Sequence, residues 1–160
     1  MLTIIDYGLG NVNAFCNIYK ELNVPFRLAS TQDDLLDATR LILPGVGAFD
    51  YAIQKLHQSD LINSINDLVL IKQIPVLGIC VGMQIMALTS DEGFSKGLGW
   101  IDASVRSFSS IHQSEIQNNK IENTIHLDQE LPLPHMGWNE LNIINSSPLF
   151  DGITINSFYF

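Results

Sequence analysis

The stretch from residue 75 to residue 82 reads Pro75-Val76-Leu77-Gly78-Ile79-Cys80-Val81-Gly82. Its first five residues predict a short buried strand, and helical spacing resumes from about Val81. One glycine stands two residues before Cys80 and another two residues after it, as in the Gly-x-nucleophile-x-Gly turn between a strand and a helix. Such a tight turn leaves almost no room for side chains, so it needs glycine at both places. We therefore expect Cys80 at the end of a buried strand; the alternative is a buried structural cysteine.

The same order of strand and helix occurs twice before this stretch. The predicted strands are apolar throughout and do not alternate, which is typical of a parallel sheet covered by helices on both faces. In such folds the chemistry lies at the carboxyl ends of the strands. The expected strands are 2–5, 25–28 and 40–43, and the expected helices are 12–22, capped by Asn11 or Asn13, a short one at 31–38, and helical segments within 52–69.

The second half of the chain has a different composition. Residues 107–130 are rich in Ser, Asn, Gln and Glu and predict a polar surface excursion. Strands are expected at 100–105, 140–144 and 157–160, with a turn near Ser147-Pro148. Since no repeat or long linker interrupts the chain, we expect one domain over residues 1–160.

Composition excludes several classes of function. The chain has 160 residues, 46% of them hydrophobic and 16% charged, which suffices for one ordinary core. Eight Lys+Arg against 17 Asp+Glu give a net charge of −9, which argues against nucleic acid or an anionic membrane as the main partner. No apolar stretch reaches the roughly 18 residues of a membrane span, and no basic residue opens the chain as in a secretory signal. A cytoplasmic location is the expectation.

The two cysteines, Cys16 and Cys80, are not spaced as metal ligands or as a disulfide framework. We expect no metal and no cofactor. A nucleophilic cysteine still needs donors for an oxyanion, and the amide of Val81 is placed to be one of them. The loop Gly45-Val46-Gly47 follows the strand at 40–43 and is expected beside Cys80 as the second donor. The alternatives are an ordinary turn or a phosphate loop, but no phosphate-loop ending follows.

Four segments together carry a family resemblance. They are Asp6-Tyr7-Gly8-Leu9-Gly10-Asn11, Leu43-Pro44-Gly45-Val46-Gly47-Ala48-Phe49, Gly78-Ile79-Cys80-Val81-Gly82-Met83-Gln84 and Pro134-His135-Met136-Gly137-Trp138-Asn139. In this order, the chain closely resembles the glutaminase subunits of imidazole glycerol phosphate synthases, which are class I glutamine amidotransferases. The resemblance implies a flavodoxin-like α/β fold, a three-layer sandwich with a mostly parallel sheet. It also implies a cysteine that attacks the side-chain amide of glutamine and releases ammonia.

The resemblance assigns roles residue by residue. It implies that Cys80 is the nucleophile and that Val81 with Gly45, Val46 and Gly47 forms the oxyanion hole. The residues implied to hold glutamine are Gly47, Gln84 and Glu92. The residues implied to face the partner are Asn11, Asn13 and His135. Gln84 lies one helical turn after Cys80, where the alternative is a solvated helix residue. For Glu92 the alternative is a helix-end charge, and for His135 a loop residue fixed by its prolines.

The chain departs from the family in its histidines. A cysteine glutaminase needs a histidine base oriented by a carboxylate, which the family supplies as a His-x-Glu pair near the carboxyl terminus. None of His57, His112, His126 and His135 stands in a His-x-Glu motif. We therefore expect that the domain over 1–160 lacks the part that carries this pair. Hydrolysis of glutamine by this chain alone is expected to be very weak or absent.

The implied partner is a synthase (cyclase) subunit of barrel fold, in a heterodimer that uses the ammonia in histidine biosynthesis. Two alternatives stay open from the sequence. Related glutaminases serve amidotransferases that build surface sugars such as lipopolysaccharide, and a chain without its base is also compatible with a catalytically inactive binding subunit. A cysteine peptidase or thiol hydrolase of similar fold shares the turn around Cys80, but Gln84 and the segment 134–139 favour the glutaminase.

Overall fold

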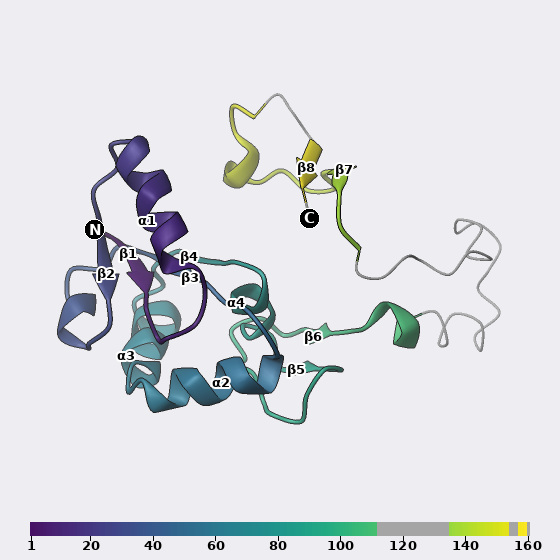
Figure 1. The fold of residues 1–160 in the computed structure, drawn as a ribbon, viewed down its shortest axis with the longest axis horizontal. Coiled ribbons are helices and arrows are strands. Elements are labelled where there is room, and N and C mark those ends of the chain that lie inside the picture. Colours follow the sequence, from purple (N-terminus) through teal and green to yellow (C-terminus); the bar gives the residue numbers. More distant parts are fainter. Residues whose placement is uncertain (112–134, 154–156, 160) are drawn as a thin grey trace. The chain divides into compact units, whose positions relative to one another are not determined.

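The computed structural model describes residues 1–111, 135–153 and 157–159 (Figure 1). Contacts within the chain divide it into two units, Met1–Ser114 and Glu115–Phe160. The first unit contains the elements predicted around Cys80, and the described part of the second unit contains a strand pair and a short helix. Among the described residues no helix is long and apolar enough to cross a membrane.

The first unit is built on a four-stranded parallel sheet. Its strands are β1 (Leu2–Ile5), β2 (Phe26–Ala29), β3 (Arg40–Leu43) and β4 (Val76–Gly78), in the order β2-β1-β3-β4. Leu43 pairs with Gly78, so β3 and β4 end at the same edge of the sheet. Because all four strands run in one direction, the loops after β1, β3 and β4 leave the sheet at one edge. The predicted parallel α/β architecture is confirmed.

Helices cover both faces of this sheet, as the apolar strands predict. The helices are α1 (Val12–Glu21), α2 (Phe49–Gln58), α3 (Ile62–Asn66), which continues as a π-helical turn at Asp67–Ile71, and α4 (Val81–Gln84). Ile4 and Ile42 form a core cluster on one face with Cys16 of α1. Ile5 and Leu43 point to the other face, where α2, α3 and α4 pack. The result is a three-layer arrangement, visible around β1 and β3 in Figure 1.

Two expected elements of the first unit are much shorter than predicted, and the strand expected at 75–79 is observed as β4 over Val76–Gly78. The helix expected at 31–38 is only a 3₁₀ turn, η1 (Asp33–Leu35), in which the Asp34 carboxylate accepts bonds from the amides of Ser30 and Thr31 and from the Thr31 hydroxyl. The strand expected at 100–105 is reduced to β6 (Ser104–Val105), which pairs in parallel with β5 (Thr89–Ser90).

In the second unit, β7 (Trp138–Glu140) pairs antiparallel with β8 (Ser157–Tyr159). The expected strand at 140–144 therefore lies two residues earlier, where the Trp138 ring meets the Tyr159 ring edge-on at 5.8 Å. The expected turn near Ser147 is the start of a 3₁₀ helix, η3 (Pro148–Phe150), capped by the Ser147 side chain. Of the polar excursion at 107–130, residues 108–111 form a helical turn and residues 112–130 lie outside the described residues.

Candidate active site

Cys80 occupies a strained turn between β4 and α4. Its backbone has φ +55° and ψ −124°, a region that residues with a Cβ rarely adopt, and the residue is exposed. The turn is held by hydrogen bonds from the amide of Ile79 to the Leu43 carbonyl at 3.0 Å and from the amide of Gly82 to the Ile79 carbonyl at 2.9 Å. The sequence predicts this tight turn between a strand and a helix, and Cys80 is exposed at the carboxyl end of β4.

The two glycines around Cys80 are required for space. A Cβ on Gly78 would lie 2.7 Å from the Met83 amide nitrogen, and one on Gly82 would lie 2.9 Å from the Pro44 carbonyl carbon and closer still to the Leu43 carbonyl oxygen. Backbone atoms cannot yield as flexible side chains do, so neither position accepts alanine without movement of a strand or a helix. The predicted reason for the glycine spacing is thus confirmed.

The loop after β3 lies against the Cys80 turn. A Cβ on Gly45 would approach the Val81 carbonyl carbon at 2.8 Å, which shows how tightly the two backbones pack. Val81 begins α4, so its N–H has no acceptor within the helix. Val46 and Gly47 are exposed, and Gly47 has φ +87°. The structure therefore places Gly45 against Val81, while the oxyanion role of Val81, Gly45, Val46 and Gly47 stays a prediction.

Tyr7 ties the loop after β1 to the loop after β3. Its hydroxyl donates to the Pro44 carbonyl oxygen at 2.8 Å, and burial raises the pKa of Tyr7 to about 12. A Cβ on Gly10 would lie 2.8 Å from the Pro44 Cβ, so the first loop also packs on this proline. The sequence predicts no role for Tyr7, although this residue stands two residues after a buried strand and within one of the four segments that carry the family resemblance.

The two other residues expected at the glutamine pocket differ in setting. Gln84 is one helical turn after Cys80, and its backbone N–H donates to the Cys80 carbonyl oxygen at 3.2 Å. Among the side chains that the structure describes, the Oε1 atom of Gln84 is the one buried polar atom without a hydrogen-bond partner. Glu92 is exposed just after β5, and its amide donates to the Ser90 hydroxyl at 3.1 Å. Both roles stay predictions.

The residues expected at the partner face lie in both units. Asn11 caps α1, because its side chain accepts from the Ala14 amide at 3.2 Å. Asn13 is exposed in the first turn of the same helix. His135 is exposed in the second unit, ahead of β7. The structure thus brings Asn11 and Asn13 together at the start of α1.

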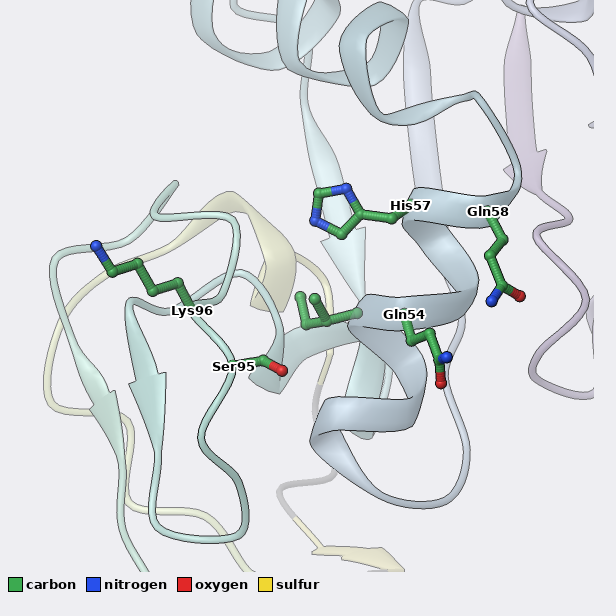
Figure 2. A pocket seen from close by; sticks show the side chains of 6 residues that line it. Gln54, His57, Gln58, Ser95 and Lys96 are labelled. Carbon is green, nitrogen blue, oxygen red and sulfur yellow. The ribbon is translucent and has the colours of Figure 1, made fainter.

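A separate hollow of about 530 Å³ lies between α2 and the loop after β5 (Figure 2). It is lined by Ile53, Gln54, His57, Gln58, Ser95 and Lys96, so His57 belongs to this hollow and Cys80 does not. Figure 2 shows the His57 imidazole projecting from α2 toward the side on which Ser95 lies. No three His, Cys, Asp or Glu side chains within the described ranges are grouped so that they could hold a metal ion.

A parallel sheet with an exposed residue in a strained strand-to-helix turn is the arrangement of α/β enzymes that place a nucleophile at such a turn. Residues 3–153 match the family of class I glutamine amidotransferases, and the chain belongs to this family. It is 45% identical over 161 residues to "Imidazole glycerol phosphate synthase subunit HisH" of Bdellovibrio bacteriovorus, covering 100% of this chain and 72% of that protein.

Two further relatives agree with this assignment. The identity is 41% over 161 residues with the subunit of the same name from Leptospira interrogans, again with 100% of this chain and 72% of the relative covered. It is 37% over 161 residues with "Imidazole glycerol phosphate synthase subunit HisH 2" of Pseudomonas aeruginosa, with 100% and 71% covered. The resemblance seen in the four sequence segments is therefore confirmed, and so is glutaminase chemistry as the activity of the family.

Proposed function

We propose that this chain is the glutaminase subunit of an imidazole glycerol phosphate synthase. It would hydrolyse glutamine to glutamate and deliver the ammonia to a synthase subunit in histidine biosynthesis. The observation that carries the proposal is the exposed, strained Cys80 directly before the first amides of α4. The names of the relatives at 37–45% identity support this branch over the surface-sugar amidotransferases.

The proposed reaction has two steps. The Cys80 sulfur attacks the side-chain carbonyl carbon of glutamine, the thiol proton goes to the leaving nitrogen, and ammonia departs as a thioester forms. Water then attacks the thioester carbon and regenerates the thiol with release of glutamate. In both steps the carbonyl oxygen becomes an oxyanion, to which we assign the Val81 N–H and the loop Gly45-Val46-Gly47 as donors.

We assign glutamine binding to Gly47, Gln84 and Glu92. The unpartnered Oε1 of Gln84 is an acceptor without a donor, and an N–H of bound glutamine would supply the missing partner. The exposed Glu92 carboxylate would attract the α-ammonium group of the same substrate. The assignment of Gln84 agrees with its position one helical turn after the proposed nucleophile.

The general base of the reaction is not assigned to a residue of this chain. The histidine that takes the thiol proton in such enzymes stands in a His-x-Glu pair, and the 160 residues contain no such pair. The chain matches 72% of the length of each of the relatives from Bdellovibrio bacteriovorus and Leptospira interrogans. We therefore propose that residues 1–160 alone capture glutamine at Cys80 with very weak turnover, and that the full hydrolysis described above requires such a base.

The proposed partner is a cyclase subunit of barrel fold, which forms a heterodimer with this chain in the cytoplasm. The heterodimer would act as a lyase, and its cyclase subunit would consume the ammonia. Asn11 and Asn13 at the start of α1, with His135, are the proposed contacts. Co-elution of the chain with such a cyclase subunit in size-exclusion chromatography tests the assembly. Loss of co-elution in Asn11→Ala and Asn13→Ala is expected, whereas wild-type chain that elutes alone at micromolar concentrations would contradict the assembly.

The glutamine site is tested with diazo-oxo-norleucine, an electrophilic glutamine analogue, followed by peptide mass mapping. We expect saturable labelling of Cys80, protection by glutamine, and no labelling of the buried Cys16. Equal labelling of both cysteines, or labelling of Cys80 that glutamine does not slow, would overturn the proposal.

A further inference from the structure

Asp50, in the first turn of α2, holds the loop that follows β5. The Phe94 amide donates to one carboxylate oxygen of Asp50 at 3.0 Å, and the Ser95 amide donates to the other at 2.9 Å. Both oxygens are therefore engaged by successive amides, 44 and 45 residues further along the chain. Figure 2 shows Ser95 and Lys96 of this loop across from α2. Bonds to an ionised carboxylate are stronger than bonds between neutral groups.

The neighbouring Gly93 makes this contact possible. A Cβ on Gly93 would collide with the Asp50 carboxylate, while its φ is outside the positive range. Glycine is thus needed at this position for space and not for its backbone conformation. The bonds from the Phe94 and Ser95 amides also lower the pKa of Asp50, because they favour its charged form. The Asp50 carboxylate can therefore reach the two amides only because residue 93 has no side chain.

This contact joins two segments that are distant in sequence. Asp50 stands three residues after Gly47, in the helix whose first residue, Phe49, is fully buried. Gly93 directly follows Glu92, so a shift of the 93–95 loop is transmitted to that carboxylate. No strand pairing joins β5 to β3 or β4 among the described elements, because β5 pairs with β6. Backbone bonds from the Asp91 amide to Val105 and from the Gly93 amide to Ser90 hold the loop to its own strand pair, and the bonds to Asp50 hold it to α2.

We propose that Asp50 is a positioning residue for glutamine binding, which holds the loop carrying Glu92 against the helix that begins beside Gly47. This inference rests on the proposed function, since it assumes that Gly47 and Glu92 contact glutamine. Asp50 itself touches neither the substrate nor Cys80 in the proposal. Its role is to keep the two binding segments at a fixed separation, so that glutamine meets both without first ordering the loop.

The test compares two variants that break the contact in different ways. Asp50→Asn replaces one acceptor oxygen by a donor that faces an amide, and Gly93→Ala displaces the carboxylate while Asp50 keeps its charge. Asp34→Asn is the matched control, because the Asp34 carboxylate accepts from the Ser30 and Thr31 amides in the loop after β2. Labelling of Cys80 is followed at increasing concentrations of diazo-oxo-norleucine, and separately with iodoacetamide, which needs no glutamine pocket.

Both test variants are expected to raise the half-saturating concentration of the glutamine analogue about tenfold, the change that corresponds to 1.4 kcal/mol of binding. The limiting labelling rate, the iodoacetamide rate and the thermal midpoint should stay near those of the Asp34→Asn control. The double variant should bind no more weakly than either single one, because both remove the same contact. Such a split between binding and reactivity does not arise from general loosening of the fold.

Each contrary outcome points to a different statement. Labelling of the wild-type chain that does not saturate, or that glutamine does not slow, would refute the proposed function and this inference with it. Saturable wild-type labelling with the same half-saturating concentration in all variants would refute the positioning role alone. A parallel fall of the iodoacetamide rate and the thermal midpoint in Asp50→Asn and Gly93→Ala would also refute it, in favour of a purely structural contact.

Discussion

The hydroxyl of Tyr7 donates a hydrogen bond to the carbonyl oxygen of Pro44 across 37 residues of sequence. This bond joins the loop after β1 to the loop after β3, directly before Gly45. Since Gly45 packs on the Val81–Gly82 backbone, Tyr7 supports the proposed oxyanion loop from the side opposite Cys80's own strand. A buried hydroxyl thereby fixes the backbone that the reaction uses.

Replacing Tyr7 by Phe should lower the free energy of unfolding by about 1–2 kcal/mol, because the buried Pro44 carbonyl loses its donor while the ring still fills its place. Urea denaturation followed by circular dichroism measures this change. Tyr51→Phe, at an exposed position of α2, is the control and should leave the stability unchanged. An unfolding free energy of Tyr7→Phe equal to that of wild type would contradict a stabilising bond.

The same tyrosine predicts a loss of stability in alkali. The pKa of Tyr7 is about 12 in the folded chain, above its ordinary value near 10, because burial disfavours the phenolate. The contribution of the neutral Tyr7 side chain to the free energy of unfolding is thus complete below pH 10. As the pH rises from 10 to 12 this contribution is lost, and the free energy of unfolding falls by on the order of 2 kcal/mol. Denaturation midpoints at pH 9, 10 and 11 measure the slope, which should be shallower in Tyr7→Phe. Identical slopes would contradict the assignment.

The glycine after the nucleophile predicts a large steric cost. In Gly82→Ala the new methyl group meets the Leu43 carbonyl oxygen and the Pro44 carbonyl carbon, both of them backbone atoms. We expect destabilisation of more than about 3 kcal/mol, or failure to fold. Gly8→Ala is the comparison, because Gly8 has φ +83° and open space around it, so only the conformational cost of about 1 kcal/mol applies. Thermal midpoints that fall equally in the two variants would contradict a steric origin.

The sequence predicts those parts of the fold and site that depend on local patterns. The strand at 40–43 is observed to the residue, and the helix at 12–22 ends one residue earlier than expected. The turn at Cys80 is predictable because its glycines record a local shortage of space. The approach of Gly45 to this turn is also predictable, since consecutive strands in such folds end at one edge and β3 indeed pairs with β4.

The remaining features depend on contacts that no local pattern records. The bonds from Tyr7 to Pro44 and from Phe94 to Asp50 span 37 and 44 residues, and they follow from the order of strands and the packing of loops. The strand pair of the second unit was displaced for a similar reason. The apolar residues at 141–144 suggest a strand, but the strand that pairs with β8 is 138–140, where the Trp138 and Tyr159 rings are in contact.

The two cysteines should differ sharply in reactivity. Cys80 is exposed at the end of β4, whereas Cys16 is buried in the core cluster under α1 with Ile4 and Ile42. Iodoacetamide should alkylate Cys80 at least about tenfold faster than Cys16 in the native chain, because access controls thiol reactivity. Peptide mapping after brief exposure gives the ratio, and unfolding in urea should abolish it. A native ratio near one would contradict the exposed position of Cys80.

The unpartnered oxygen of Gln84 predicts opposite effects on stability and on function. In Gln84→Met the side chain keeps its length but loses a buried acceptor that has no donor in the ligand-free chain. Removal of that desolvated group should raise the free energy of unfolding by about 0.5–1 kcal/mol. The same variant should bind diazo-oxo-norleucine at least about tenfold more weakly, since an N–H of the ligand would lose its acceptor.

Gln58→Met provides the control for this last prediction, because Gln58 is exposed on α2 and the substitution there tests the general effect of a methionine for a glutamine. It should change neither quantity. Urea denaturation of the ligand-free chain and saturation of Cys80 labelling measure the two effects on the same preparations. A Gln84→Met chain that is less stable than wild type would mean that the Oε1 atom has a partner in solution. Unchanged affinity would mean that its missing partner is not the substrate.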